Sequence, residues 1–434
     1  MARFKMETST KEKKPSRQAW DFDAFRSQFK ALDETVDEKT LVYFDNACTM
    51  LKPASVSETV ARFHLRAGAC GGKRSTHLLA QKVEALIQES RQEIADFIGA
   101  ESADEIVFTS GTTEAMNILA RSFPYKGTRR EVIISDLEHN AVFLPFYESF
   151  QRGEIELKIC PSREGQIDLG ALERLITDKT ALLAVTSASN VTGGVQPLSE
   201  VIKIAHRHGA LVISDAAQYV PSHKVDFSAL NVDFAAFSGH KLGGPFGFGI
   251  LYGKAHLLNR LHSSKVGGGT VRSVLLNGSQ IQIEYLDAPE RFEAGIQNIG
   301  GALGLAQAIR VLKQVPAGIL RSHIAKLVRR AINGLSKFSG IEILGRTEDL
   351  IDGSIVSFYP KDPQFSISDF NLFLNHELPR HFIAIRAGEH CAHLLHQSYK
   401  IPNTVRLSFF AYNTPEEIDL FLDALNAFAR EAKA

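Results

Sequence analysis

The sequence contains few cysteines for its length, which excludes a disulfide-stabilised protein. Four occur in 434 residues and they are widely separated: Cys48, Cys70, Cys160 and Cys391. Small secreted domains that depend on disulfides carry many more, so we expect free thiols in a reducing cytoplasm. Most free cysteines there are buried apolar residues, and a cysteine in an unusual context is a candidate nucleophile.

The sequence also lacks a charge excess and long apolar runs. Its 49 basic and 49 acidic residues give a formal net charge of zero, so we expect neither nucleic acid nor a membrane as a partner. No stretch of 18 or more apolar residues occurs, and no transmembrane helix is expected. Residues 1–18 are charged without an apolar core, which predicts a disordered tail and not a secretory signal. A targeting role for this tail stays open.

Short apolar runs that alternate with helical segments predict an α/β fold. A mostly parallel sheet with helices on both faces follows from this alternation. The predicted strands are 41–44, 105–109, 131–135, 181–186, 211–215 and 234–238, and the predicted helices are 20–29, 113–123, 169–176 and 198–208. A second unit follows a helix-rich stretch after residue 291, with strands at 354–358 and 404–409 and a helix after residue 415.

We therefore expect four parts in the chain. These are the tail at residues 1–18, a helical segment at 19–40, a large domain at 41–300 and a small C-terminal domain at 301–434. Ligands of parallel α/β sheets bind at the carboxyl ends of the strands, so the site is sought there.

The segment 110–114, Ser-Gly-Thr-Thr-Glu, lies between a predicted strand and a predicted helix. Gly111 allows a tight turn, and the amides that follow it begin a helix, where the dipole favours an anion. The hydroxyls of Thr112 and Thr113 could add donors to a phosphate. A simple helix cap at Thr112 is the alternative.

Asp215 and Lys241 each follow an apolar strand. A carboxylate at the end of a buried strand needs a partner, and a protonated pyridine nitrogen would be one, although an ordinary loop aspartate is equally compatible with Asp215 alone. Lysines are usually solvated, but Lys241 lies in a glycine-rich loop between two apolar strands. A lysine in such surroundings can have a lowered pKa and form a Schiff base.

The combined pattern resembles a known enzyme family. Lys241 ends a Ser-Gly-His-Lys motif, Asp215 and Gln218 form an Asp-x-x-Gln pair, and a Gly-Thr-Thr-Glu motif begins at Gly111. Further segments occur in the family's order at 43–47, 138–140, 189–193 and 291–295. From about residue 40 to its end, the chain resembles class V fold-type I pyridoxal-phosphate enzymes. Within them it is most similar to group II cysteine desulfurases and selenocysteine lyases.

The resemblance implies pyridoxal 5′-phosphate as the cofactor and a role for each matching residue. Lys241 would hold the cofactor covalently, Asp215 would pair with its ring nitrogen, and His139 would stack on its ring. The other implied cofactor contacts are Asn190 and Gln218 near the phenolic oxygen, and Gly111, Thr112, Thr113, Ser238 and His240 near the phosphate. His77 aligns with a family active-site histidine and is expected to contact the substrate. The family also implies a seven-stranded sheet, a small α+β domain and a homodimer.

The segment 386–392 resembles the family's Arg-x-Gly-x-His-Cys-Ala loop, with Cys391 as the nucleophile. Cationic neighbours favour the reactive thiolate, so Arg386 and His390 are expected to provide positive charge near its sulfur. Arg406 matches the arginine that binds the substrate carboxylate, for which a guanidinium fork is well suited. Arg386 and Asn190 are expected to complete the substrate contacts.

Two alternatives for this segment come from the residues themselves. His390, Cys391, His393 and His396 are all metal-binding residue types, so a zinc site is one alternative. Structural zinc sites usually combine two separated ligand pairs, and no second pair is evident, so we expect no metal. A buried inert thiol is the other alternative, although a polar loop that contains glycine rarely buries a cysteine.

The chain departs from the family pattern at Cys48, Glu389 and Ile296. The family prefers a small residue at Cys48 and often has histidine at Glu389, whose carboxylate is expected to disfavour the thiolate or to alter partner docking. Ile296 replaces a threonine whose hydroxyl reaches the phosphate in the neighbouring subunit, and isoleucine cannot make that hydrogen bond.

These observations predict a cysteine desulfurase that converts L-cysteine to L-alanine and transfers the sulfur to Cys391. A sulfur-acceptor protein is a possible partner. The alternatives are a selenocysteine lyase, another C–S lyase or a class V aminotransferase with the same cofactor. A sulfur-carrier or interaction protein without catalysis is a further alternative, which Lys241, Asp215 and His139 disfavour.

Overall fold

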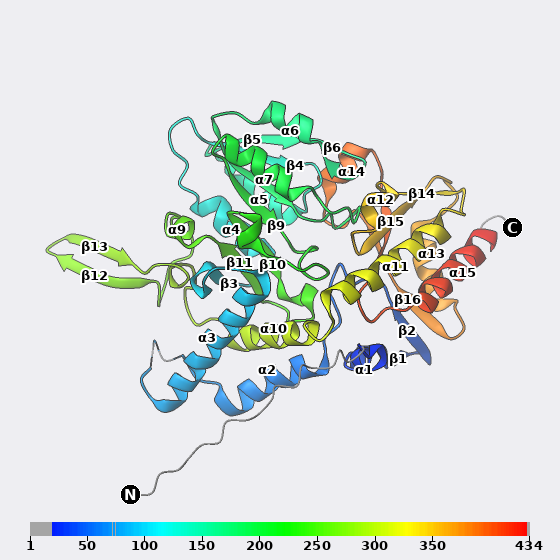
Figure 1. The fold of residues 1–434 in the computed structure, drawn as a ribbon, viewed down its shortest axis with the longest axis horizontal. Helices are drawn as coiled ribbons and strands as arrows, with labels where there is room; N and C mark the ends of the chain where they lie inside the picture. The colour runs from blue at the N-terminus through cyan, green and yellow to red at the C-terminus, as the bar shows by residue number, and fades with distance from the viewer. Residues whose placement is uncertain (1–19, 72, 74, 432–434) are drawn as a thin grey trace, which may run out of the picture.

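The computed structural model describes residues 20–71, 73 and 75–431, so the predicted tail lies outside the described residues. Within these residues a seven-stranded sheet forms the centre of the molecule (Figure 1). Its order is β3 (Ile106–Thr109), β11 (Gly249–Gly253), β10 (Phe234–Ser238), β9 (Leu211–Asp215), β8 (Thr180–Thr186), β4 (Glu131–Ser135) and β5 (Glu156–Cys160). β11 runs antiparallel to both of its neighbours, and the other neighbouring pairs are parallel. The predicted α/β fold with a mostly parallel sheet is confirmed.

The strands of this sheet form because their apolar side chains are covered on both faces. Along β4, Val132 and Ile134 pack in one hydrophobic cluster, while Ile133 packs in the other. Successive side chains of a strand point to opposite faces, so each cluster lies on its own side of the sheet. One face is covered by α4 (Thr112–Ser122), α5 (Asn140–Gln151) and α9 (Ala255–Leu258), and the opposite face by α3 (Leu78–Ile98), α6 (Leu169–Leu175), α7 (Leu198–Arg207) and α10 (Ile299–Leu312).

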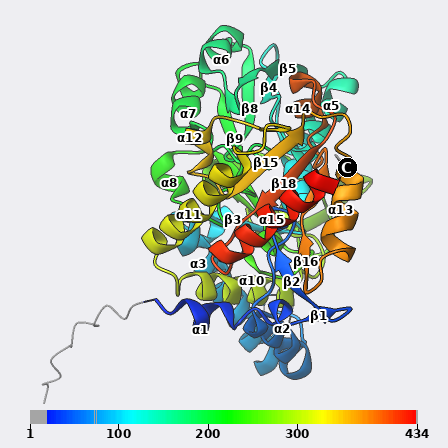
Figure 2. The ribbon, with the colours of Figure 1, turned by 90° about the vertical axis from the view of Figure 1, so that its right-hand side faces the viewer.

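A second sheet lies in the C-terminal part of the chain (Figure 2). Its order is β14 (Ile341–Ile343), β15 (Ile355–Pro360), β18 (Thr404–Ser408) and β17 (Arg386–Gly388). The helices α11 (Ala317–Leu335), α13 (Ile367–His376) and α15 (Pro415–Glu431) lie beside it. This sheet places the cysteine loop, which follows β17, next to the arginine at the centre of β18.

The N-terminal part of the chain joins this C-terminal part through a small sheet. β1 (Thr35–Val36) pairs with β2 (Lys39–Tyr43), and β2 pairs in parallel with β16 (His381–Ala384). The chain then enters α2 (Ala54–Ala67), which packs on α10 beneath the central sheet. The predicted domain boundaries stay a prediction.

The predicted helix at 20–29 is shorter in the structure. Asp21 caps α1 (Phe22–Arg26) by accepting a hydrogen bond from the amide of Ala24, and a 3₁₀ turn at Lys30–Leu32 follows. The turn between them lets Phe29 pack on the buried ring of Tyr412, with 4.6 Å between the ring centroids. Tertiary packing therefore overrides the helical pattern here.

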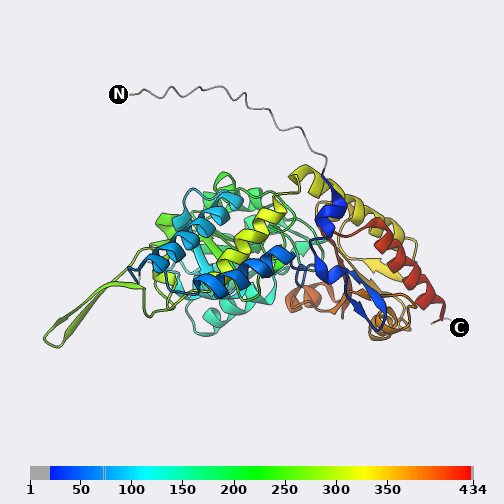
Figure 3. The same cartoon turned by 90° about the horizontal axis from the view of Figure 1, so that it is seen from below.

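The hairpin of β12 (Val271–Asn277) and β13 (Gln280–Tyr285) was not predicted. It projects from the body of the molecule at the end opposite the C-terminal sheet (Figures 1 and 3). The short elements that remain are α8 (Phe227–Leu230), α12 (Thr347–Leu350), α14 (His393–Tyr399), β6 (Ser162–Arg163), β7 (Gln166–Ile167) and the 3₁₀ helices at Ala103–Glu105, Gly239–Leu242 and Glu290–Phe292. None of the helices in the described part of the chain is long and apolar enough to cross a membrane.

Candidate active site

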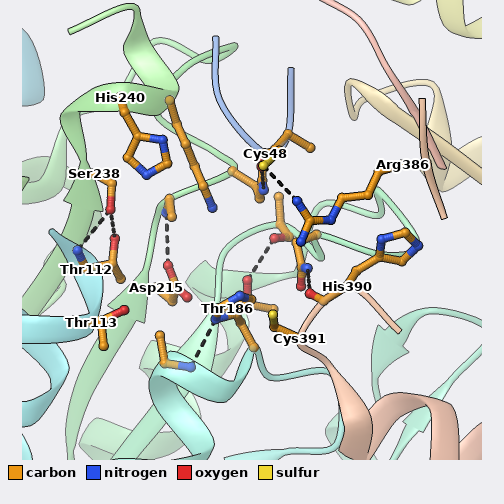
Figure 4. Close-up of a pocket in the computed structure, with 18 of the residues that line it drawn as sticks. Cys48, Thr112, Thr113, Thr186, Asp215, Ser238, His240, Arg386, His390 and Cys391 are labelled. Carbon is orange, nitrogen blue, oxygen red and sulfur yellow. Dashed lines mark hydrogen bonds between the residues drawn. The ribbon is translucent and has the colours of Figure 1, made fainter. Parts of the chain in front are cut away.

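A cavity of about 200 Å³ lies at the carboxyl ends of the central strands. Thr186, Asp215 and Ser238 line it, and they are the last residues of β8, β9 and β10. The C-terminal part of the chain contributes Arg386, His390 and Cys391 to the opposite wall (Figure 4), and Arg406 also lines the cavity. The other predicted site residues that line the cavity are Thr112, Thr113, His139, Asn190, Gln218, His240 and Lys241.

One end of the cavity has hydrogen-bond donors that suit an anion. Thr112 begins α4, and its amide and its hydroxyl both contact the Ser238 hydroxyl oxygen at 2.9 Å. Figure 4 shows these two residues close to Thr113 and His240. The first amides of an eleven-residue helix and the neighbouring hydroxyls can together bind a phosphate. The helix cap is Gly111, so the alternative interpretation of Thr112 as the cap is wrong.

Glycines allow this turn to lie against the sheet. Gly111 has a φ of 155°, which side-chain-bearing residues rarely adopt. A Cβ atom on Gly249 in β11 would lie 2.5 Å from the Cα atom of Gly111, which is inside van der Waals contact. The backbone of the anion-binding turn is therefore fixed by direct contact with the neighbouring strand.

His240 adds a polar group without a protein partner to the same end. Burial, together with the charges of Lys241 and Lys52, lowers the pKa of His240 to about 4, so the ring is neutral at physiological pH. Its Nδ1 atom is buried and has no hydrogen-bond partner in the structure. Because buried polar atoms are normally paired, this nitrogen fits a site whose ligand supplies the missing contact.

Asp215 is buried and Lys241 is half-buried, and both line the cavity. Burial lowers the pKa of the Lys241 ammonium, and the negative charge of Asp215 partly opposes that shift. Burial raises the pKa of Asp215, whereas Lys241 and the amide of Ala217, which donates to Oδ1 at 3.0 Å, lower it. A lysine whose neutral amine is favoured in this way is suited to bind a carbonyl carbon or to take up a proton.

His139 lies directly before α5 and lines the same cavity. Burial and the charges of Lys241, Arg406 and Arg386 lower its pKa to about 3. Its Nδ1 atom accepts from the amide of Ala141 at 3.0 Å, which leaves the proton on Nε2. The neutral ring is available to contact a flat ligand, and the predicted stacking role stays a prediction.

The predicted contacts Asn190 and Gln218 are hydrogen-bonded to neighbouring loops. The amide nitrogen of Asn190 donates to the carbonyl oxygen of His390 at 2.8 Å, and that of Gln218 donates to Ala47 at 2.8 Å. Asn190 therefore connects the large sheet to the cysteine loop. Gln218 fixes the turn that carries Cys48.

Two arginines face the cavity from the C-terminal sheet. Arg406 is buried in β18, where Nη1 donates to the carbonyl of Asn190 at 2.9 Å and Nη2 lies 3.2 Å from Oδ1 of Asp45. Its Nε atom is buried without a hydrogen-bond partner. Arg386 lies beside it in the antiparallel pair of β17 and β18. Adjacent guanidinium groups can bind a carboxylate of a small substrate.

Cys391 is exposed on a loop that bends sharply into the cavity. His390 and Cys391 have φ values of 51° and 56°, a conformation that costs non-glycine residues about 1 kcal/mol or more each. The carbonyl oxygen of Cys391 accepts from the amide of Asn140 at 2.7 Å, which holds the loop against α5. The exposed thiol rules out the alternative of a buried inert cysteine.

One prediction about the surroundings of this thiol requires correction. Burial and the nearby Arg406 lower the pKa of His390 to about 2, so this ring does not supply the expected positive charge. Its Nε2 atom contacts the Thr404 hydroxyl at 2.8 Å. Arg386 donates to Cys48 at 2.8 Å. Glu389 contacts His393, the first residue of α14, at 2.9 Å, and its expected effects on the thiolate and on partner docking stay predictions.

Two further predicted residues lie outside the cavity. His77 is exposed and caps α3 by accepting a hydrogen bond from the amide of Ala80 at 3.1 Å. Ile296 is 66% exposed and lines a separate cavity of about 270 Å³ with Cys70 and Arg91. The predicted substrate contact of His77 and the predicted loss of a cross-subunit hydrogen bond at Ile296 stay predictions.

Sequence reasoning did not predict Cys48 or Thr186 as site residues. Thr186 ends β8, and the rule that ligands lie at carboxyl ends of strands was a sufficient signal for it. Cys48 lies 338 positions from Arg386, and no local pattern links the two. Among the residues that the structure describes, no group of three or more histidine, cysteine or acidic side chains is placed to hold a metal ion.

Comparison with known proteins agrees with this geometry. The aminotransferase class-V family model matches residues 42–421. A probable cysteine desulfurase of Borreliella burgdorferi is 34% identical over 412 residues, which cover 94% of this chain and 96% of the relative. A cysteine desulfurase of Dickeya dadantii is also 34% identical and covers 95% of this chain and 97% of its own.

Solved structures show the same relationship. An Escherichia coli cysteine desulfurase in an S-sulfonic acid form has a TM-score of 0.84 at 32% identity, covering 95% of this chain and 99% of its own. An apo cysteine desulfurase from Thermococcus onnurineus has a TM-score of 0.85 at 32% identity, covering 94% and 98%. The chain therefore belongs to the aminotransferase class-V family, among relatives that are named cysteine desulfurases.

Proposed function

We propose that the protein is a pyridoxal-phosphate-dependent cysteine desulfurase that converts L-cysteine to L-alanine and carries the released sulfur on Cys391. One observation carries this proposal. A half-buried lysine with a lowered pKa and a buried aspartate share a cavity with an exposed cysteine and two arginines. A transaminase has no need of the cysteine, and a sulfur carrier has no need of this lysine and aspartate.

The residues fit pyridoxal 5′-phosphate on the chemistry of their donors. The amide of Thr112 and the Ser238 hydroxyl suit its phosphate, and the unpartnered Nδ1 atom of His240 suits a further oxygen of the same group. The Asp215 carboxylate suits a protonated ring nitrogen, and the Lys241 amine suits its aldehyde carbon. When bound, this cofactor withdraws electrons from the α-carbon of an amino acid and so eases the loss of the α-proton.

The substrate is held through its carboxylate. The guanidinium groups of Arg406 and Arg386 bind the two carboxylate oxygens and orient the α-carbon toward Lys241. Because burial disfavours the charged form of Lys241, its Nζ atom takes up the α-proton and returns a proton as alanine forms.

Cys391 receives the sulfur. Its thiolate attacks the substrate sulfur, the bond from that sulfur to the β-carbon breaks, and Cys391 becomes a persulfide as L-alanine leaves. One cysteine substrate thus yields one alanine and one added sulfur atom, and no external oxidant is needed. The exposure of Cys391 then allows an acceptor protein or a small thiol to remove this sulfur. A homodimer is part of the proposal.

The experiment that tests the proposal incubates the cofactor-loaded protein with L-cysteine and a reductant, and measures alanine and sulfide together. Equal amounts of both products are expected. Cys391→Ala and Lys241→Ala are expected to form neither. Pyruvate and ammonia in place of alanine, or full activity of Cys391→Ala, would reject the proposal in favour of another C–S lyase. Parallel assays with L-selenocysteine distinguish a selenocysteine lyase.

A further inference from the structure

Cys48 places a second thiol in the active-site cavity. It comes from the turn that follows β2, whereas Cys391 comes from the loop that follows β17. Figure 4 shows the Cys48 side chain directed at the guanidinium of Arg386. The Nη1 atom of Arg386 donates to the Sγ atom of Cys48 at 2.8 Å.

The turn that carries Cys48 is fixed on several sides. The amide of Ala47 donates to the Ser408 hydroxyl at 2.8 Å, and the carbonyl of Ala47 accepts from Gln218 at 2.8 Å. The amide of Cys48 itself donates to the carbonyl of Asp45 at 3.1 Å. The thiol of Cys48 therefore lies on a rigid backbone, which suits it to hold the long and flexible side chain of Arg386 in place.

The same turn provides a hydrogen-bond acceptor to each of the two arginines of the cavity. Asp45 contacts Arg406 at 3.2 Å, and Cys48 contacts Arg386 at 2.8 Å. A guanidinium has five N–H donors, so one contact to the thiol leaves others free for a carboxylate. Asp45 and Cys48 thus act as a matched pair of acceptors behind two cationic side chains.

We propose that Cys48 is a positioning residue that pre-orients Arg386 for the carboxylate of the amino-acid substrate. This inference rests on the proposed function, because it assigns the carboxylate to Arg386. The side chain of an arginine loses rotational freedom about several bonds when it binds a ligand. If the side chain is already held in place, that entropic penalty does not fall on the binding step. The thiol therefore strengthens substrate binding and takes no part in the transfer of sulfur.

The test compares steady-state alanine formation by the cofactor-loaded parent, Cys48→Ala and Cys48→Ser. Cys48→Ala is expected to raise KM for L-cysteine about three- to tenfold and to leave kcat within about twofold. The serine hydroxyl also accepts from a guanidinium, so Cys48→Ser restores most of the parent KM. Cys70→Ser is the matched control, since Cys70 is half-buried and lines the separate cavity.

A second comparison shows whether Cys48 acts through Arg386. In an Arg386→Lys background, Cys48→Ala is expected to change KM by less than about twofold, because the group that it positions is absent. Calorimetric titration with L-alanine gives a readout besides turnover, and Cys48→Ala is expected to raise its Kd by the same factor as KM.

The outcomes separate this inference from the function on which it rests. If the parent is active and Cys48→Ala has the same KM for L-cysteine and the same Kd for L-alanine as the parent, the positioning role is overturned. A fall in kcat at constant KM, or a Cys48 effect that persists in full with Arg386→Lys, overturns it as well. A parent that forms no alanine from L-cysteine rejects the proposed function itself.

Discussion

The backbone amide of Asn140 donates a hydrogen bond to the carbonyl oxygen of Cys391, with 2.7 Å between nitrogen and oxygen. Asn140 is the first residue of α5, and His139 before it lines the cavity. This contact joins the C-terminal cysteine loop to α5, which covers one face of the central sheet. It compensates for part of the strain of the left-handed backbone at His390 and Cys391.

Replacement of Asn140 by proline tests this contact, because proline has no amide hydrogen. The first helical position accepts proline, and His139 has φ −63° and ψ 149°, a conformation that a following proline allows. The helix should therefore form, while loss of one hydrogen bond lowers the rate of sulfur transfer about fivefold. The measurement is single-turnover alanine formation.

Asn140→Ala is the matched control for this variant. It keeps the amide donor and removes the side-chain contact with His393, which measures 2.9 Å. Near-parent rates in Asn140→Ala and reduced rates in Asn140→Pro are expected. Equal rates in both variants would show that the backbone contact does not position Cys391.

Gly249→Ala tests the packing of β11 against the anion-binding turn. The added methyl group would lie 2.5 Å from the Cα atom of Gly111 and 2.8 Å from the carbonyl oxygen of Phe237. Displacement of the turn should cost about 1–3 kcal/mol of unfolding free energy and weaken cofactor binding. Gly318→Ala in α11 is the control, since nothing lies within 4 Å of its added methyl group. Equal stability of the two variants would contradict the packing argument.

Asp215→Asn tests the buried carboxylate. Asparagine keeps the shape and can still accept from the amide of Ala217, but it carries no negative charge. A fall in kcat of about a hundredfold is expected, with cofactor still bound as judged by its visible absorbance. If kcat stayed within twofold of the parent, the charge of Asp215 would have no role in the reaction.

The two histidines of the cavity, His139 and His390, predict acid sensitivity of the fold. The pKa values of His139 and His390 are lowered to about 3 and about 2, whereas an unfolded histidine titrates near about 6.5. The unfolded state therefore binds more protons at acid pH. The stability contributed by the neutral rings is fully present above about pH 6.5 and is lost as the pH falls toward the folded values.

His390→Gln measures this effect, because glutamine does not titrate and can still contact Thr404. Between pH 7 and pH 5 the parent should lose about 2 kcal/mol more unfolding free energy than the variant, by denaturant titration. An equal loss in both proteins would show that His390 is not held neutral in the folded chain.

The sequence predicts the central fold well, because the buried strands are short and uniformly apolar. The predicted bounds of β4, β9 and β10 agree with the structure to the residue. The β12–β13 hairpin escaped prediction although Asn277-Gly278 is a hairpin signal and 280–283 alternates polar and apolar residues. Its apolar side chains are exposed, as at Leu276 and Ile281, so burial of apolar residues does not identify these strands as it identifies those of the central sheet.

The site was predictable where a residue ends a strand and less so where two distant segments meet. Asp215 and Ser238 end strands, so their position in the cavity follows from the topology of the sheet. The neutral state of His390 depends on its burial and on the charge of Arg406 nearby, which the sequence does not reveal. The contact between Cys48 and Arg386 likewise arises only when the N-terminal turn folds against the C-terminal sheet.

The most direct test of the proposed function is the mass of the Cys391 peptide after a single turnover. Cofactor-loaded protein is mixed with L-cysteine without reductant, free thiols are alkylated, and the digested peptides are weighed by mass spectrometry. The proposed function predicts that one sulfur atom is added to the Cys391 peptide, with an equal amount of alanine and no added sulfur on the Cys48 peptide. Alanine without added sulfur on Cys391, or the added sulfur on Cys48, would contradict it.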